Sequence, residues 1–164
     1  MGEQEDRAHL EAAFPGLVGT TYRIASPCRC DYNCVAFAAG DTSRRWWPHP
    51  SRYWPSGCPR EPTVGAFIAT FQHVGGYGPC TDGTFLPGCE KLAIYADAAG
   101  VPTHVARQKG ARWHSKLGDA WDILHDLGAL EGEQYGRVVG FLARSTRPAR
   151  NKAKRRRRVR GGPR

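Results

Sequence analysis

The sequence predicts an α+β fold in which helices pack on a small antiparallel sheet of about four strands. Helical patterns lie mainly in the first half of the chain, strand-like runs lie mainly in the second half, and turn residues separate those runs. With 164 residues the chain can bury one substantial core, but it is short for two domains. We therefore expect one domain over 1–144 and a disordered basic tail over 145–164.

Three segments of the first half have the character of helices. The first covers residues 5–13, and the second begins near Asn33 and ends at Gly40, with Asn33 or Asp31 as its cap. The third follows Thr63, whose hydroxyl is a suitable cap, and its apolar residues recur at helical spacing. These segments supply the helices of the predicted fold.

The second half contains the predicted strands. The runs "EKLAIYAD", "THVARQ" and "ARWHS" are separated by short turns and suit an antiparallel meander, which "GRVVGFLAR" then completes as the last strand. The segment "DAWDILHDLGAL" between them reads as a further helix. The expected sheet therefore has about four strands.

A long segment between the second and third predicted helices shows neither helical nor strand periodicity. Residues 41–62 are rich in Trp, Pro and Arg, as in "RRWWPHPSRYWPSGCPREP". An irregular segment of this length in a compact domain usually wraps a surface or covers a site. Its aromatic side chains either hold the segment down by burying large areas or stack on a ligand.

The positive charge of the chain is concentrated at its end. Eleven of the 24 Lys and Arg residues lie in 144–164, which leaves 13 basic against 15 acidic residues in 1–143. Such a tail is expected to attach electrostatically to nucleic acid or another polyanion, or only to improve solubility. In either case the tail does not define the chemistry of the domain.

The chain has no feature of a membrane or exported protein. No stretch approaches the roughly 18 consecutive apolar residues that span a bilayer. The first residues are acidic and polar, where a signal peptide is cationic and then apolar. We therefore expect a cytoplasmic protein without membrane contact, whose six cysteines are reduced.

Cys34 and His104 are the candidate catalytic pair. A cysteine attacks only as the thiolate, and a helix start and a nearby imidazole both favour that form. Cys34 lies at the predicted helix start, and His104 opens a predicted central strand whose hairpin partner brings Ser115 or His114 beside the imidazole. Asp122 is the reserve candidate for that third position. The order of these residues is that of papain-like thiol hydrolases.

Two other roles compete for Cys34. A lone cysteine near a helix start is most often a small buried residue. Cys28, Cys30 and Cys34 also form a C-x-C-x₃-C cluster that Cys58 or His49 would complete as a zinc site. Structural zinc sites usually show paired C-x₂₋₄-C motifs, and only one loose cluster is present. We therefore expect neither a metal nor a cofactor.

Seven segments together resemble an uncharacterised bacterial domain family of unknown function: "YNCVAFAAGD", "WWP" with "YWP", "EKLAIYAD", "THVARQ", "SKLG", "DILH" and "YGRVVGFLAR". The family motifs are N-C-[IV]-A-W-A-A-G-D, T-H-x-A-R-Q and S-K-L-G, and the likeness covers about 14–144. Phe37 stands where the family more often has Trp. The resemblance implies a papain-like fold with Cys34 as nucleophile and His104 as base.

The chain departs from papain-type proteases before the cysteine. They carry a glutamine a few residues earlier that stabilises the oxyanion, and "CRCDYN" contains none. The backbone N–H of Cys34 and the side chain of Asn33 are the available substitutes. Gln108 shares a strand face with His104 and serves either the structure or the substrate.

The sequence thus predicts a cysteine hydrolase or acyl transferase, of amidase, deamidase or peptidase type, acting on an amide or peptide substrate. Cys34, His104 and Ser115 would be its catalytic residues, supported by Asn33 and Gln108. The alternative is a non-catalytic module that binds a partner through segment 41–62 and a polyanion through its basic tail.

Overall fold

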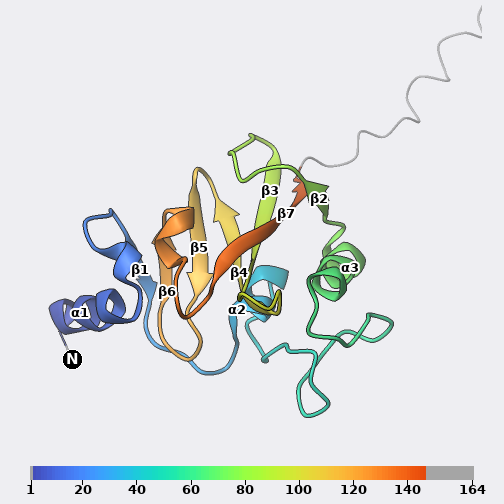
Figure 1. Cartoon of the computed structure of the whole chain (residues 1–164), viewed down its shortest axis with the longest axis horizontal. Helices are drawn as coiled ribbons and strands as arrows, with labels where there is room; N and C mark the ends of the chain where they lie inside the picture. The colour runs from blue at the N-terminus through green and yellow to red at the C-terminus, as the bar shows by residue number, and fades with distance from the viewer. Residues whose placement is uncertain (1, 147–164) are drawn as a thin grey trace, which may run out of the picture.

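The computed structural model describes residues 2–146, which form one seven-stranded antiparallel sheet with helices on both faces (Figure 1). The strands are β1 (Arg23–Ser26), β2 (Gly78–Cys80), β3 (Cys89–Ala96), β4 (Pro102–Lys109), β5 (Arg112–Lys116), β6 (Asp122–His125) and β7 (Arg137–Ser145). The helices are α1 (Glu3–Ala13), α2 (Cys34–Ala39) and α3 (Val64–Gly75), with short 3₁₀ turns η1 (Pro15–Leu17) and η2 (Leu127–Leu130). The strand order is β1-β6-β5-β4-β3-β7-β2.

The predicted papain-like α+β fold with a sheet of about four strands is wrong. Seven strands dominate the described residues, and the three α-helices are few beside them. The prediction missed β1, β2 and β6, because each of these short strands is defined by its partner rather than by its own sequence. The edge strand β2, for example, consists of Gly-Pro-Cys and exists through its pairing with β7.

Segment 119–130 shows why a helix prediction failed. Asp122 and His125 have helical spacing, but Trp121, Ile123 and His125 also alternate, and that alternation places three buried side chains on one sheet face. Strand β6 pairs with β5 on one side and with β1 on the other. Only the short turn η2 of the expected helix is helical.

The central strand β3 is buried on both faces, and this places a core on each side of the sheet. Leu92 and Ile94 pack with α2, α3 and segment 41–62, whereas Ala93 and Tyr95 pack with α1, η1 and η2. A continuous apolar run such as "LAIYA" is typical of a strand covered on both sides. The sheet is therefore the middle layer of three.

The predicted caps of α2 and α3 and the predicted end of α2 are confirmed, whereas α1 begins at Glu3, two residues before the predicted start. Asn33 caps α2 by accepting a hydrogen bond from Ala36 N, and Gly40 ends this helix in the left-handed conformation with φ of 83°. Thr63 caps α3 in the same way. These local signals were readable because capping depends on residues adjacent in sequence.

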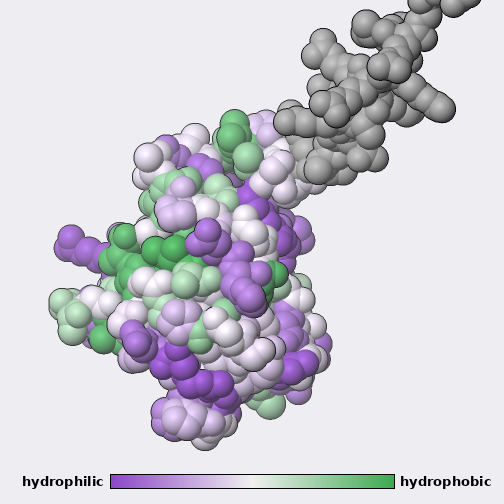
Figure 2. Space-filling view, turned by 90° about the vertical axis from the view of Figure 1, so that its right-hand side faces the viewer, coloured by the Kyte–Doolittle hydropathy of each residue, from purple (hydrophilic) through white to green (hydrophobic). Residues whose placement is uncertain are grey.

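The predicted basic tail lies almost wholly outside the described residues. Strand β7 continues to Ser145, and the segment 147–164 is not described. Within 2–146 no helix is both long enough and apolar enough to cross a membrane. The surface on the α3 side carries hydrophobic residues mainly in its middle part, with a largely hydrophilic region below (Figure 2).

Gly136 lies just before β7, at the point where the chain passes close to the backbone at the end of β3. Its φ is 71°, and a Cβ atom there would lie 1.9 Å from the carbonyl oxygen of Ala96. Gly136→Ala should lower the free energy of unfolding by about 3 kcal/mol or more, because strain and a backbone clash combine. Gly100→Ala is the matched control, since φ is 80° and the space is open. It should lose only about 1 kcal/mol in urea unfolding. Equal losses in the two variants would contradict the clash.

Candidate active site around Cys34

Cys34 is the first residue of α2 and lies largely buried, with 7% of its surface exposed. Burial raises the pKa of its thiol above the ordinary value. The backbone N–H groups of Val105, Val35 and Cys34 itself, together with the charge of Arg45, partly offset that rise. Helix α2 has only six residues, so its dipole adds little to the stability of a thiolate. Cys34 is therefore a neutral thiol in this state.

His104 and Ser115 are brought together as predicted, and His125 extends the pair into a chain. His104 Nε2 lies 2.8 Å from Ser115 Oγ, which lies 2.8 Å from His125 Nε2. His125 Nδ1 in turn lies 2.8 Å from the backbone oxygen of Asp126. All three side chains are fully buried. Adjacent strands β4, β5 and β6 supply them, which is why they line up across the sheet.

The proton positions along this chain follow from its last acceptor. A carbonyl oxygen only accepts, so His125 Nδ1 carries the proton that it donates to Asp126. Burial lowers the pKa of His125 to about 4, so its Nε2 is unprotonated at neutral pH and accepts from the Ser115 hydroxyl. Ser115 then accepts from His104 Nε2–H.

The remaining nitrogen of His104 is therefore a bare acceptor. Burial lowers the pKa of His104 well below its ordinary value, so the ring is neutral and Nδ1 carries a lone pair. This atom is buried and has no hydrogen-bond partner among the described residues. Buried polar atoms are nearly always paired, so an unpaired one marks strain or function.

Cys34 and His104 lie on different sides of the sheet near the beginning of β4. Cys34 packs in the core under α2 together with Val105, whereas the His104 ring lies against Tyr95 and Tyr135 on the other side of the strand. No hydrogen bond between residues 2–146 joins Cys34 Sγ and His104 Nδ1. The Tyr135 ring stacks on His104 at 4.2 Å between centroids, and it lines the same cavity as Cys34.

That cavity has a volume of about 440 Å³ and opens between segment 41–62 and the sheet. Its lining residues are Asn33 and Cys34 from the start of α2, Thr103, Gly118 and Tyr135 from the sheet side, and Arg45, Trp47, His49, Ser51 and Arg52 from segment 41–62. The segment therefore lines a cavity together with Cys34. The cavity gives a reagent access to the thiol.

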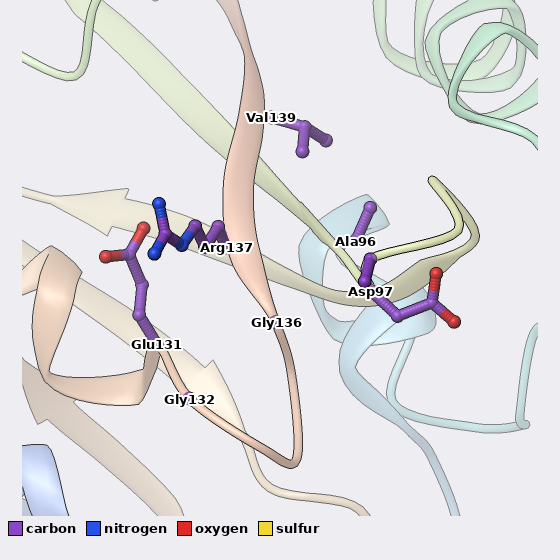
Figure 3. A pocket seen from close by; sticks show the side chains of 8 residues that line it. Ala96, Asp97, Glu131, Gly132, Gly136, Arg137 and Val139 are labelled. Carbon is purple, nitrogen blue, oxygen red and sulfur yellow. The ribbon is translucent and has the colours of Figure 1, made fainter.

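Another cavity, of about 570 Å³, lies between the end of β3 and the beginning of β7 (Figure 3). Asp97 and Glu131 are its acidic side chains and Arg137 is its basic one. It contains no cysteine, serine or histidine. The cavity at Cys34 is smaller, but it alone of the two contains a nucleophile.

Asn33 acts as a cap and as an anchor for segment 41–62. Its Oδ1 accepts from Ala36 N at 3.3 Å and from Trp46 N at 3.0 Å, and its Nδ2 donates to Trp46 O at 2.7 Å. Both ends of the amide are thus engaged in holding the backbone. A part in stabilising an oxyanion stays a prediction.

Gln108 and His114, also predicted near the site, lie away from Cys34. Gln108 Nε2 donates to Gly83 O at 2.8 Å, so it fastens the loop before β3. The His114 ring packs edge-on against Phe37, with 4.7 Å between centroids, and does not reach His104. Ser115 is therefore the hydrogen-bond partner of His104.

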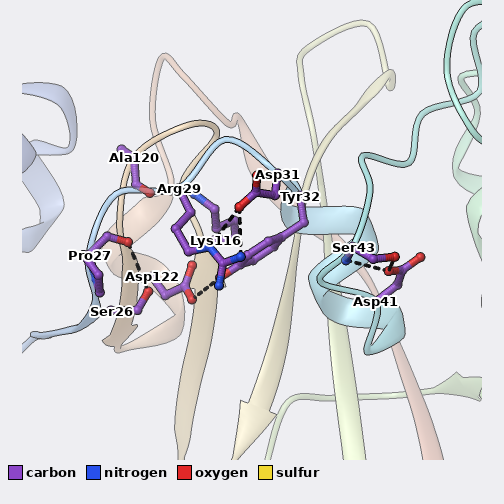
Figure 4. Close-up of polar contacts among 10 residues, drawn as sticks. All are labelled: Ser26, Pro27, Arg29, Asp31, Tyr32, Asp41, Ser43, Lys116, Ala120 and Asp122. Atoms are coloured by element: carbon purple, nitrogen blue, oxygen red, sulfur yellow. Dashed lines mark hydrogen bonds and ion pairs between the residues drawn. The ribbon is translucent and has the colours of Figure 1, made fainter.

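Asp122 belongs to a separate buried cluster (Figure 4). It accepts a hydrogen bond from Tyr32 OH at 2.8 Å, and Lys116 Nζ lies over the Tyr32 ring at 5.4 Å from its centroid. Lys116 Nζ also donates to Ala120 O at 2.5 Å. These contacts fasten the chain before α2 to β5 and β6. Asp122 is thus not the group that orients His104.

The described residues offer no set of ligands for the zinc site considered above. Among residues 2–146 no group of three or more His, Cys, Asp or Glu side chains is arranged to hold a metal. Cys28 and Cys30 are exposed, whereas Cys34 is buried, and all are free cysteines. The C-x-C-x₃-C spacing therefore does not converge on one point.

Sequence reasoning missed two residues of this site. His125 lies in a segment that the spacing predicts as a helix, although it also alternates with Trp121 and Ile123 as in a strand. Tyr135 follows a run of polar residues in "EGEQYGR" and carries no local signal. Its place beside His104 depends on the hairpin closed between Gly132 and Gly136.

The buried imidazoles predict a loss of stability in acid. In the unfolded chain a histidine takes up a proton below pH of about 6.5, whereas His125 in the fold stays neutral until pH falls to about 4. The unfolded state therefore binds more protons across this window, and the free energy of unfolding falls by about 3 kcal/mol from His125 alone.

Urea unfolding at pH 7.0 and pH 4.5 measures this loss. His125→Gln should reduce the pH dependence, while His73→Gln, at an exposed position of α3, should keep it. The same dependence in His125→Gln as in the wild type would contradict the assignment of a neutral buried His125.

One family model matches the chain, over residues 23–143, and describes a domain of unknown function, DUF7689. The match agrees with the resemblance to an uncharacterised domain, and it includes Cys34, His104 and Ser115. Neither the search of curated proteins nor the search of solved structures found a match. Because the matched range covers well over half of the 164 residues, the chain belongs to the DUF7689 family of domains of unknown function.

Proposed function

We propose that the domain is a cysteine hydrolase or acyl transferase in which Cys34 is the nucleophile and His104 is the general base. The observation that carries this proposal is the hydrogen-bond chain through Ser115 and His125, which leaves His104 Nδ1 as a bare and buried acceptor. A base needs such a lone pair. The substrate class is an amide, peptide or ester.

The reaction begins when the Cys34 proton passes to His104 Nδ1 and the sulfur attacks the carbonyl carbon. The oxyanion forms within reach of the backbone N–H of Cys34, which has no helical acceptor because it begins α2. The leaving amine or alcohol takes the proton from His104, and a thioester remains on Cys34. Water or a second acceptor then attacks the thioester, gives its proton to His104, and restores the thiol.

Ser115 and His125 act as positioning residues in this scheme. When His104 gains a proton on Nδ1, the Nε2–H bond to Ser115 keeps the ring in place. The hydrogen bond that Sγ and Nδ1 lack in the described structure has to form with substrate bound. Catalytic contacts in free enzymes are often long and tighten only in the complex.

The second candidate is a binding module that performs no chemistry. The absence of a hydrogen bond between Cys34 Sγ and His104 Nδ1 within residues 2–146, together with the raised pKa of the thiol, favours this alternative. The cavity would then hold a partner group without reacting. The predicted attachment of the tail to a polyanion falls on residues outside those described.

Acylation by p-nitrophenyl acetate separates the two candidates. We expect release of nitrophenolate with the acetyl group located on Cys34 by mass spectrometry, faster than on exposed Cys28 or Cys30. His104→Gln keeps an N–H donor for Ser115 but lacks the lone pair of Nδ1. It should slow acylation of Cys34 by at least about 100-fold.

Cys34→Ser shows how much release comes from other groups, and melting temperatures confirm that the variants fold. Acetyl groups spread evenly over Cys28, Cys30 and Cys34 would contradict the enzyme proposal. An unchanged rate in His104→Gln would remove His104 from the mechanism.

A further inference from the structure

We propose that the cavity at Cys34 selects acyl compounds that carry a negative charge, such as a carboxylate, next to the reacting carbon. This inference rests on the proposed thiol chemistry of Cys34 and names the substrate class of that site. It comes from the charges that segment 41–62 places around the thiol.

The lining of the cavity is cationic. Its positive charges are the guanidinium groups of Arg45 and Arg52, and none of its lining residues is acidic. By contrast, the cavity lined by Asp97, Glu131 and Arg137 has mixed charge. A concave site lined by one sign of charge concentrates ligands of the opposite sign.

Both guanidinium groups have free capacity for an anion. Arg45 forms an ion pair with Asp119, whose side chain is 66% exposed, so water screens much of that attraction. Arg52 makes no ion pair with any described residue. A guanidinium presents five N–H donors in a planar fork that fits a carboxylate.

The segment that carries these cations is fixed in place. Arg60 Nη1 donates to His49 O at 2.9 Å and to Arg52 O at 3.1 Å. His49 Nδ1 also lies 2.8 Å from Ser51 Oγ. Because these contacts order the segment before a ligand arrives, binding needs little further loss of conformational entropy.

The other end of the segment is tied directly to the helix that begins with Cys34. Asn33 holds both the N–H and the C=O of Trp46, the residue that follows Arg45. The positive charge of Arg45 acts on the sulfur of Cys34: it lowers the pKa of the thiol, although burial raises that pKa by more. An anionic group bound by the arginines would therefore lie close to the nucleophile.

The wider surface is consistent with a polar entrance. Segment 41–62 lies at the lower end of the molecule in Figure 1, and the surface at that height in Figure 2 is largely hydrophilic. The buried cluster of Lys116, Tyr32 and Asp122, in contrast, balances its own charges and lines none of the cavities described above (Figure 4).

Iodoacetate and iodoacetamide provide the test, because they are similar in size and differ in charge. In both cases the sulfur displaces iodide, so a C–S bond forms, the C–I bond breaks, and the thiol proton passes to His104 or to buffer. The rate at Cys34 is followed by mass spectrometry in the full-length protein at pH 7.5 and low salt. The neutral thiol N-acetylcysteinamide serves as the reference.

We expect the ratio of the iodoacetate rate to the iodoacetamide rate at Cys34 to exceed the reference ratio by about tenfold. The double variant Arg45→Gln with Arg52→Gln should bring the ratio down to the reference. Both rates are expected to fall when Arg45 is replaced, because its charge lowers the pKa of the Cys34 thiol, and the ratio cancels this common change. Arg23→Gln removes the same type of charge from an exposed residue of β1 and should keep the wild-type ratio. Added salt should reduce the ratio.

A wild-type ratio equal to the reference, or an unchanged ratio in the double variant, overturns the proposed selection of anions. In either case rapid labelling of Cys34 by iodoacetamide would leave the proposed thiol chemistry standing. If neither reagent labels Cys34 faster than Cys28 and Cys30, the proposed chemistry fails and the inference fails with it.

Discussion

The burial of β3 and β4 on both faces is the constraint on which the rest of the structure depends. The two strands are neighbours at the centre of the sheet, and the side chains of "LAIYA" on β3 are all inaccessible to solvent. One layer of helices cannot cover two apolar faces. The chain therefore places α2 and α3 on one side and α1, η1 and η2 on the other.

This double burial also decides the chemistry of the polar residues on the central strands. His104, Ser115 and His125 have no access to water, so they must satisfy one another. The chain of hydrogen bonds ends on a carbonyl oxygen, and that single acceptor fixes which nitrogen of each imidazole carries its proton. A structural requirement for pairing thus leaves one unpaired nitrogen, the feature expected of a base.

Segment 41–62 joins the site to the fold through Asn33. The same amide that caps α2 also holds the backbone of Trp46, so the position of Cys34 and the position of the arginines are coupled. Because these two hydrogen bonds fix the backbone of Trp46 to α2, a long segment without regular secondary structure can still form the wall of a defined cavity. It also makes Asn33 a structural residue.

The sequence by itself determined the local elements: the caps Asn33 and Thr63, the strands β3, β4, β5 and β7, and the hairpin that brings β5 beside His104. These depend on residues that are close in the chain. The structure decided that Ser115, rather than His114, is the partner of His104. Only the tertiary structure shows that the sheet has seven strands rather than four and that residues 122–125 form β6 rather than a helix. It also places His125 and Tyr135 beside Ser115 and His104. Those features depend on partners far apart in sequence, and short segments such as 78–80 and 122–125 take the form that burial against those partners favours.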